Sequence, residues 1–300
     1  MNRRGRHRAR TLVGLIAIAV LLLSACGSDS TERIVIGSKN FTEQAVLAEI
    51  LAQHLERRTD LSVERRLFLA GTLICHQSII SGSIDMYVEY TGTALTAILH
   101  EPMRADEGEV LEHTRRLYAQ RFGLEMLDPL GFNNTFAMLV RNEDAERLGL
   151  RTISDAVPHA REWRLGFGYE FLERPDGFPG FSKAYGLEME PPPRLMDLGL
   201  VYRTLRDGQI DLAVGNSTDG LIGALNLFIL EDDLGFFPPY EAVPVVRRET
   251  LSRHPEIAEA LAELSGKIDE AEMRNLNYAI DGEHRNLKEV VREFLDVEFP

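Results

Sequence analysis

The sequence lacks the motifs by which many enzymes hold a cofactor, a metal or a nucleophile. It contains no HExxH, no CxxC and no Walker loop. The GFG at residues 166–168 continues into Tyr-Glu-Phe and therefore fails the dinucleotide fingerprint. Ser217 in GNSTDG lacks the Gly two residues later that a nucleophile elbow needs. We therefore predict that the chain is not an enzyme and that it binds no cofactor and no metal.

The sequence also lacks an apolar run long enough to span a membrane comfortably. The run at residues 12–23 has twelve residues, and it follows five arginines within the first ten positions. This order is typical of a secretory signal peptide. The next stretch, Leu23-Ser24-Ala25-Cys26, resembles the lipobox of bacterial lipoproteins. That resemblance implies a signal peptide at 1–25, a lipid on Cys26 and a tether at 26–32. The alternative is an ordinary secretory signal that contains a stray cysteine.

Positive charge is scarce, because 47 acidic residues face 33 basic ones. Cleavage before Cys26 would remove five arginines and no acid, which leaves 28 basic and 47 acidic residues and a formal charge of −19. This balance argues against a nucleic-acid partner and is compatible with a cationic or zwitterionic one. With Cys26 lipidated, Cys75 is the only remaining cysteine, so we expect no internal disulfide.

One pattern occurs twice in the chain. Residues 81–95 read SGSIDMYVEYTGTAL and residues 207–221 read DGQIDLAVGNSTDGL. Each copy predicts a helix end, a buried strand and the polar start of a helix. In α/β sheets, ligands gather at the carboxyl ends of strands, so two such ends suggest two lobes that face each other across a cleft. The alternative is that GxID is an ordinary junction that recurs by chance. Asp85 and Asp211, just inside the strands, fit structural hydrogen bonding better than catalysis.

The predicted elements around the first copy alternate between strands and helices. A strand at 33–37, a helix at 45–57, a strand at 61–69 and a helix at 72–80 precede it. Asn40 and Glu43 fit a capping box at the start of the first helix. The alternation predicts a parallel, doubly wound lobe.

Later segments favour a second lobe and a return to the first. Residues 130–140 read as a crossing strand, residues 169–186 as a patch rich in loops, and the chain past residue 230 as an extended return followed by helices. We therefore predict an α/β protein with two doubly wound lobes joined by a hinge. Lobe 1 comprises 33–135 and the return 226–300, and lobe 2 comprises 136–225. Such a protein can close around a small molecule.

Several long motifs occur in a fixed order that resembles one family. They are GSKNFTEQ (37–44), AGT (70–72), EYTGT (89–93), GFNNTFA (131–137), EFLERPDGFPG (170–180), STDG (217–220) and FPPYEAVPV (237–245). Together they resemble the substrate-binding proteins of osmoprotectant ABC importers, the glycine betaine/carnitine/choline group. The resemblance covers residues 33–298.

This resemblance implies a type II periplasmic-binding-protein fold. It also implies an extracytoplasmic lipoprotein, in the periplasm or at the cell surface, that delivers a solute to a membrane permease with its ATPase. The family's ligands carry a quaternary ammonium, which keeps its positive charge and has no N–H to donate. Aromatic faces would then supply much of the recognition, at about 0.5–2 kcal/mol per cation–π contact. Helix N-termini or an arginine would hold a ligand carboxylate.

Carried over by position, the resemblance implies a set of ligand-binding residues at the ends of strands and in the crossing. Tyr90 and Phe136 would offer ring faces, although Phe136 could equally belong to the core. Arg174 would be an anion clamp or a partner in a lobe-closing salt bridge, and it could equally be tied to Asp176. The full set is Ser38, Lys39, Asn40, Phe41, Tyr90, Thr91, Gly92, Thr93, Asn134, Thr135, Phe136, Arg174, Asn216, Ser217, Thr218 and Asp219, with Tyr169 and Tyr240 as weaker candidates.

The sequence departs from the family pattern at three of these motifs. Relatives often have Tyr where this chain has Phe136 and Asn216, and some have Asp where it has Ala94. These changes predict weaker binding of simple betaines, and a larger betaine or amine could use Asn216. Three alternatives stay open: an importer receptor for betaine-like compounds, a receptor of the same fold for another metabolite, and an extracytoplasmic sensor or enzyme.

Overall fold

Two five-stranded sheets organise the protein, and the computed structural model describes residues 33–187 and 192–300. The predicted signal peptide, Cys26 and the tether lie outside these residues. Residues 34–300 form one compact unit. None of the helices in the two described ranges is long and apolar enough to cross a membrane.

The first sheet has the strand order β2-β1-β3-β10-β4. β1 and β3 run parallel, with Ile36 opposite Met86, whereas β10 runs antiparallel to both β3 and β4. Its strands are β1 (Arg33–Lys39), β2 (Ser62–Ala70), β3 (Met86–Tyr90), β4 (Leu124–Met126) and β10 (Ala242–Arg247). The helices in this part of the chain are α2 (Thr42–Arg58), α3 (Thr72–Ile80), α4 (Thr91–Thr93), the π-helical turn η1 (Ala94–Ile98), α5 (Glu107–Phe122), α12 (Arg248–Arg253), α13 (Glu256–Ala262), α14 (Glu270–Asp281) and α15 (Leu287–Glu298).

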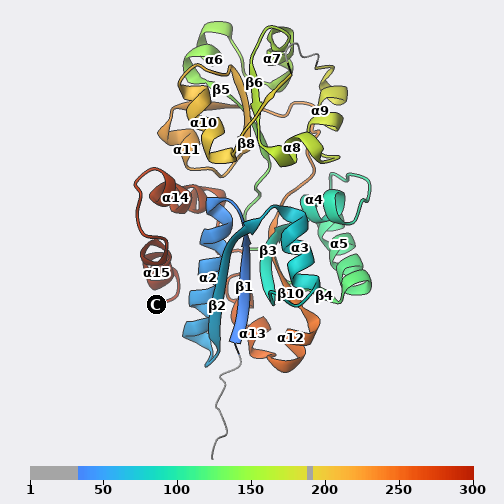
Figure 1. Ribbon diagram of the computed structural model, residues 1–300, viewed down its shortest axis with the longest axis vertical. Helices are drawn as coiled ribbons and strands as arrows, with labels where there is room; N and C mark the ends of the chain where they lie inside the picture. The colour runs from blue at the N-terminus through green and yellow to red at the C-terminus, as the bar shows by residue number, and fades with distance from the viewer. Residues whose placement is uncertain (1–32, 188–191) are drawn as a thin grey trace, which may run out of the picture. The chain divides into compact units, whose positions relative to one another are not determined.

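Side chains of the first sheet alternate between two cores. Met86 and Val88 pack with α2, α13, α14 and α15, whereas Tyr87 packs with α3, η1 and α5. This is the period of two that a strand imposes on its side chains. Figure 1 shows α2 and α15 on one side of the sheet and α3 and α5 on the other. Because both faces are covered, β3 is buried along its whole length, which explains its near-continuous apolar sequence.

The second sheet has the strand order β7-β6-β8-β5-β9. β6 pairs in parallel with β7 and β8, and β5 pairs antiparallel with β8 and β9. Its strands are β5 (Phe136–Arg141), β6 (Leu165–Phe167), β7 (Arg194–Leu195), β8 (Leu212–Asn216) and β9 (Leu227–Leu230). The helices around it are α6 (Asn142–Leu148), α7 (Ile153–Ala160), α8 (Tyr169–Glu173), α9 (Phe178–Tyr185), α10 (Leu198–Arg206) and α11 (Leu221–Ala224).

The structure corrects several details of the sequence-based fold. Each sheet is mixed rather than parallel, because β5 and β10 run against their neighbours. β9 lies beyond the predicted boundary at residue 226, yet it pairs with β5 and so belongs to the second sheet. Apart from this strand, the division into lobes stays a prediction. The patch predicted to be rich in loops, 169–186, contains α8 and α9.

The capping box predicted at Asn40 and Glu43 is wrong. Helix α2 begins one residue later than that box requires, with Phe41 as its N-cap and no side-chain cap. Glu43 is buried and accepts hydrogen bonds from side chains far along the chain instead of from the helix start. Tertiary contacts therefore override the local capping signal here.

The repeated GxID segments form the same local structure in both sheets. Gly82 and Gly208 have positive φ angles of 75° and 68°, a conformation that favours glycine. The carboxylate of Asp85 accepts the Val35 N–H at 2.8 Å, and that of Asp211 accepts the Arg164 N–H at 3.0 Å. The prediction that both aspartates are structural is confirmed.

Candidate ligand-binding site

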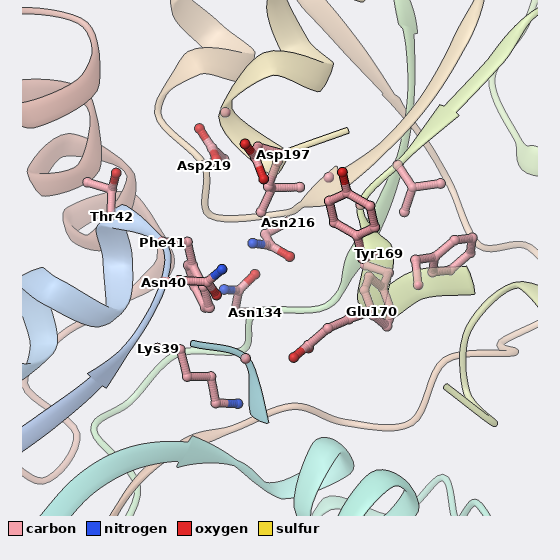
Figure 2. Close-up of a pocket in the computed structure, with 18 of the residues that line it drawn as sticks. Lys39, Asn40, Phe41, Thr42, Asn134, Tyr169, Glu170, Asp197, Asn216 and Asp219 are labelled. Carbon is pink, nitrogen blue, oxygen red and sulfur yellow. The ribbon is translucent and has the colours of Figure 1, made fainter. Parts of the chain in front are cut away.

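A cavity of about 480 Å³ lies where the carboxyl ends of strands from both sheets meet. The first sheet contributes the segment after β1 and the end of β3, and the second contributes the segment after β6 and the end of β8. This is the end of an α/β sheet at which ligands bind. The volume falls in the range of small-molecule pockets. Figure 2 shows Asp197 and Asp219 on one side of the drawn residues and Lys39 and Glu170 on the other.

Most of the ligand-binding residues predicted from the sequence line this cavity. They come from five separate motifs, which the fold brings to one place. They are Lys39, Asn40, Phe41, Tyr90, Thr93, Asn134, Phe136, Arg174, Asn216 and Asp219. The weaker candidates Tyr169 and Tyr240 line it as well.

The remaining predicted residues do not line the cavity, because the fold uses their polar groups elsewhere. The Thr91 hydroxyl donates to the Pro239 carbonyl and accepts from the Glu241 N–H. Thr218 is fully buried and donates to Glu43. The residues that lie outside the cavity wall are Ser38, Thr91, Gly92, Thr135, Ser217 and Thr218. The hydroxyls of Ser38, Thr91, Ser217 and Thr218 make hydrogen bonds within the fold, whereas that of Thr135 is buried without a partner among the described residues.

The two predicted ring faces are already in contact with cations of the protein. The Arg174 guanidinium lies 4.9 Å from the centroid of Phe136 and 5.8 Å from that of Tyr240. The Lys39 ammonium lies 5.2 Å from the centroid of Tyr90, whose ring is only 4% exposed. Phe136 also packs against Phe171 and Tyr240. Both rings therefore belong to the wall and to the core at once.

Other aromatic rings in the wall are more accessible. Tyr169, at the start of α8, is 56% exposed, and Phe41 is partly buried and stacks on Tyr90. Tyr169 directly precedes the EFLERPDG motif. The exposure of Tyr169 depends on how the chain turns between β6 and α8, so the sequence alone gives only a weak indication that Tyr169 lines the cavity.

Four carboxylates line the cavity, and the sequence analysis selected only Asp219. Burial raises the pKa of Asp219 to about 7, and the nearby carboxylates Asp281 and Glu43 add to the shift. Burial also raises the pKa of Asp281. Asp197 is exposed at the start of α10. The fourth is Glu170. A cavity with these groups attracts positive charge.

Two of the three cations of the wall, Lys39 and Arg174, have their own counter-charges behind it. Lys39 donates to Glu89 at 2.5 Å, and both side chains are almost completely buried. Arg174 is paired with Asp176, which also accepts from the Tyr240 hydroxyl at 2.6 Å. The alternative that ties Arg174 to Asp176 is therefore confirmed.

Two contacts link the second sheet's helix region to the first across the cavity. Glu170 of α8 accepts the N–H of Thr72, the first residue of α3, at 2.7 Å. Arg174 donates to the Thr93 hydroxyl at 3.0 Å. Burial opposes ionisation of Glu170, but Lys39, Arg174 and the bonds from Thr72 outweigh it and lower its pKa. Glu170 is thus a charged group in the cavity wall.

Glu43 joins segments that are far apart in the sequence beside the cavity. Its carboxylate accepts hydrogen bonds from Tyr90, Asn134, Thr218 and Asn277. Burial raises its pKa, and these four donors act in the opposite direction. The sequence reasoning missed this role because it assigned Glu43 to a helix cap.

Among residues 33–187 and 192–300, no cluster of His, Cys, Asp and Glu could hold a metal ion. Residues of the wall that the sequence analysis did not select come mainly from α8 and from the start of α10. They are Thr42, Phe68, Gly71, Gly168, Glu170, Phe171, Met196, Asp197, Leu198, Gly199, Arg203, Val214, Gly215, Leu221 and Asp281. Glu170 and Phe171 lie inside a motif that the family resemblance includes, whereas nothing in the sequence marks Asp197 or Arg203.

Comparisons with known proteins agree with this geometry. A family model described as the substrate-binding domain of the ABC-type glycine betaine transport system matches residues 32–297. The carnitine transport binding protein OpuCC of Listeria monocytogenes is 37% identical over 290 residues, which are 94% of this chain and 93% of that protein. A glycine-betaine-binding protein of Pseudomonas aeruginosa is 35% identical and aligns with 95% of this chain and 94% of its own.

A solved structure supports the same assignment. The crystal structure of a glycine betaine/carnitine/choline ABC transporter protein superposes with a TM-score of 0.75 at 34% identity, covering 88% of this chain and 98% of the other. The predicted type II periplasmic-binding-protein fold is thus confirmed. Members of the matched family are extracytoplasmic solute-binding components of transporters and not enzymes. The chain belongs to the family of substrate-binding domains of ABC-type glycine betaine transport systems.

Proposed function

We propose that this protein binds a betaine-like quaternary ammonium osmolyte in the cavity between its two sheets and delivers it to an ABC permease. The observation that supports this most is the chemistry of the cavity wall. Aromatic rings alternate there with four carboxylates, while Lys39 and Arg174 are neutralised from behind by Glu89 and Asp176. A quaternary ammonium can only be recognised by ring faces and by negative charge, because it has no N–H to donate.

The fold gives this site a way to close around the solute. Glu170 and Arg174 reach from the second sheet's helix region to Thr72 and Thr93 in the first part of the chain. A ligand held by rings and carboxylates from both sides would favour the closed arrangement, since it stabilises the state in which it makes the most contacts. The closed form would then be the one that docks on the permease. Lipid attachment at Cys26 would keep the receptor at the membrane that holds its permease.

One observation favours an alternative ligand within the same function. The rings of Phe136 and Tyr90 already contact Arg174 and Lys39, so the aromatic surface left for a simple betaine is smaller than the family pattern implies. A different small metabolite that relies more on the carboxylates and amides of the wall would fit this arrangement. The exposed ring of Tyr169 remains available for either ligand.

Ligand-dependent melting of the chain from residue 27 onward tests the proposal. The panel consists of glycine betaine, proline betaine, carnitine, choline, ergothioneine and simple amino acids. A ligand at a hundredfold excess over its Kd adds about 2.7 kcal/mol to the stability, which gives a clear shift. The neutral compound 3,3-dimethyl-1-butanol has the shape of choline without its charge. We expect choline to shift the melting temperature and this analogue to have no effect.

A matched pair of variants assigns the binding to the cavity. Asp197→Asn removes an exposed carboxylate from the wall, and Asp60→Asn removes an exposed carboxylate that does not line it. We expect weaker binding of quaternary ammonium compounds in the first variant and unchanged binding in the second. If no member of the panel shifts the melting temperature, the proposed ligand class is wrong.

A further inference from the structure

The side chain of Asn216 faces the cavity without a partner. Its backbone is fixed at the end of β8, opposite Phe136 in β5, and its N–H donates to the Tyr202 hydroxyl at 2.9 Å. Within the part of the chain that the structure describes, the Asn216 amide group makes no hydrogen bond, although it lines the cavity. The position of this amide is therefore set by the sheet, while its donor and acceptor are left to the cavity.

A second amide close to Asn216 also has an unpaired oxygen. Asn134 lies two residues before Phe136 and lines the same cavity. Its Nδ2 donates to Glu43 at 2.7 Å, so the Oδ1 atom, on the other side of the amide carbon, points elsewhere. Among the described residues this buried Oδ1 has no partner. Unpaired buried polar atoms are uncommon in folded proteins, and at a cavity they point to a bound group.

The cation expected in this cavity cannot satisfy these amides. A quaternary ammonium has neither an N–H nor a lone pair, so it forms no ordinary hydrogen bond with Asn216. The hydrogen-bonding group must then be a second part of the ligand. The cavity of about 480 Å³ has room for such a group.

We propose that Asn216 selects, among quaternary ammonium compounds, those that carry a hydroxyl or N–H group beside the cation. This inference rests on the proposed function and narrows its substrate class. Asn216 forms a hydrogen bond with the second group of the ligand, and the neighbouring Asn134 oxygen contributes to the same polar patch. A carboxylate can accept from the Asn216 Nδ2 but has no hydrogen to donate to the Asn134 oxygen, so compounds that carry the cation and only apolar or carboxylate groups bind more weakly.

Two pairs of ligands that differ by one hydroxyl test the proposal. Choline is compared with ethyltrimethylammonium, and carnitine with γ-butyrobetaine, by isothermal titration calorimetry on the chain from residue 27 onward. One net neutral hydrogen bond corresponds to an affinity difference of about 3- to 10-fold. We expect the hydroxylated member of at least one pair to bind more tightly by this factor. We expect Asn216→Leu to reduce the ratio to about 1 by lowering the affinity for the hydroxylated member alone.

Two further variants make the result specific to Asn216. Asn216→Asp keeps an acceptor at the same place and should retain a preference for the hydroxylated member. Gln120→Ala removes an exposed amide that does not line the cavity and should leave the ratio unchanged. Circular dichroism and the melting temperature check that each variant is folded.

Each other outcome overturns the inference. Equal binding within both pairs would mean that the two amides form hydrogen bonds with water and not with the ligand. This inference would then be wrong, while the proposed function would stand. A ratio that persists in Asn216→Leu, or that falls equally in Gln120→Ala, would show that Asn216 does not make the selection. If wild type binds no member of either pair, the proposed function fails and this inference fails with it.

Discussion

The two copies of the repeated segment, 81–95 and 207–221, have the same backbone and present different chemistry. In both, the aspartate N–H donates at 2.7 Å to the carbonyl of the preceding parallel strand, Val35 for Asp85 and Arg164 for Asp211. In both, the residue at the end of the strand lines the cavity, Tyr90 in the first copy and Asn216 in the second. The first copy therefore offers a ring where the second offers an amide.

The same comparison explains where the cavity obtains its negative charge. Three residues further on, the first copy has Thr93 and the second has Asp219, and both line the cavity. Ala94, which follows TGT in the first copy, is fully buried, so in these two segments the carboxylate of the wall comes from Asp219 in the second copy. The two copies thus place a hydroxyl and a carboxyl group at equivalent points of one scaffold.

The largest expected difference between the copies is in the free energy of unfolding of variants at one position. This position is the residue just before the last residue of β3 and of β8. Glu89 in the first copy pairs with buried Lys39, whereas Gly215 in the second leaves room for the Tyr202 ring. Glu89→Gln leaves a buried ammonium without its counter-charge, so we expect the free energy of unfolding to fall by about 3–5 kcal/mol. A Cβ at Gly215 would lie 2.4 Å from the Tyr202 hydroxyl oxygen, so Gly215→Ala should cost about 1–3 kcal/mol.

Urea unfolding of both variants measures these costs. The double variant Lys39→Met/Glu89→Leu removes both charges and should recover much of the stability that Glu89→Gln loses, since an apolar pair often replaces a buried ion pair without loss. A cost below 1 kcal/mol for Glu89→Gln would contradict the importance of the ion pair.

Substitution of the two GxID aspartates should give a smaller difference in the free energy of unfolding. Asp85→Ala leaves the Val35 N–H and the fully buried Thr250 hydroxyl without an acceptor, which should cost about 2–3 kcal/mol. Asp211→Ala should cost about 1–2 kcal/mol, because the side chain of Arg164 is 42% exposed and Arg141 keeps its bond to Asp144. Urea unfolding at pH 7 compares the two, and a larger cost for Asp211→Ala would reverse the expected order.

The dependence of stability on acid pH should reveal a second feature of the copy that contains Asp211. Although burial opposes it, hydrogen bonds from Arg164 and Arg141 lower the pKa of Asp211 to about 2, below its ordinary value of about 4. The native state therefore holds this proton less tightly than the unfolded state. Its stabilisation is present above pH 4 and is lost as the pH falls from about 4 towards 2. Asp211→Asn should lack this part of the acid dependence.

Local patterns in the sequence were sufficient for most of the fold. Apolar periodicity located β1, β2 and α2, and the GxID repeat identified the equivalent strands β3 and β8. The antiparallel direction of β10 was missed, because strand direction depends on which neighbour a distant segment meets. The α8 and α9 helices were missed because their glycines and prolines read as turns, although Pro179 lies at a helix start, where proline is tolerated.

The residues alone, without the family resemblance, predicted the site where each copy of the repeat ends a strand. Tyr90 and Asn216 follow directly from that rule, and both line the cavity. Thr218 belongs to such a motif as well, but its hydroxyl turns inward to Glu43. Asp197 comes from the start of a helix that carries no binding motif, so only the folded chain brings it to the wall. Contacts between segments that are distant in the chain cannot be recognised from a single sequence.

The smallest expected effect is a dependence of ligand affinity on pH. It comes from the second copy, because Asp219 titrates whereas Thr93, its counterpart in the first copy, does not. Burial, with smaller contributions from Asp281 and Glu43, raises the pKa of Asp219 to about 7 against the opposing hydrogen bonds of the Leu221 N–H and the Tyr202 hydroxyl. The ionised form attracts a cation, and its fraction rises from about a tenth at pH 6 to about nine tenths at pH 8. Choline, which keeps one charge over this range, should therefore bind about 3- to 9-fold more tightly at pH 8.

The stability of the ligand-free protein should change in the opposite direction as the pH rises. An aspartate with a raised pKa binds its proton more tightly in the native state, so stability should decrease as the pH rises from about 4 to about 7. Asp219→Asn should remove both trends, and Asp281→Asn controls for the neighbouring carboxylate. Calorimetric titration at pH 6, 7 and 8 measures the affinity. If Asp219→Asn keeps the full pH dependence of choline binding, another group in the wall titrates, and the second copy does not supply the counter-charge.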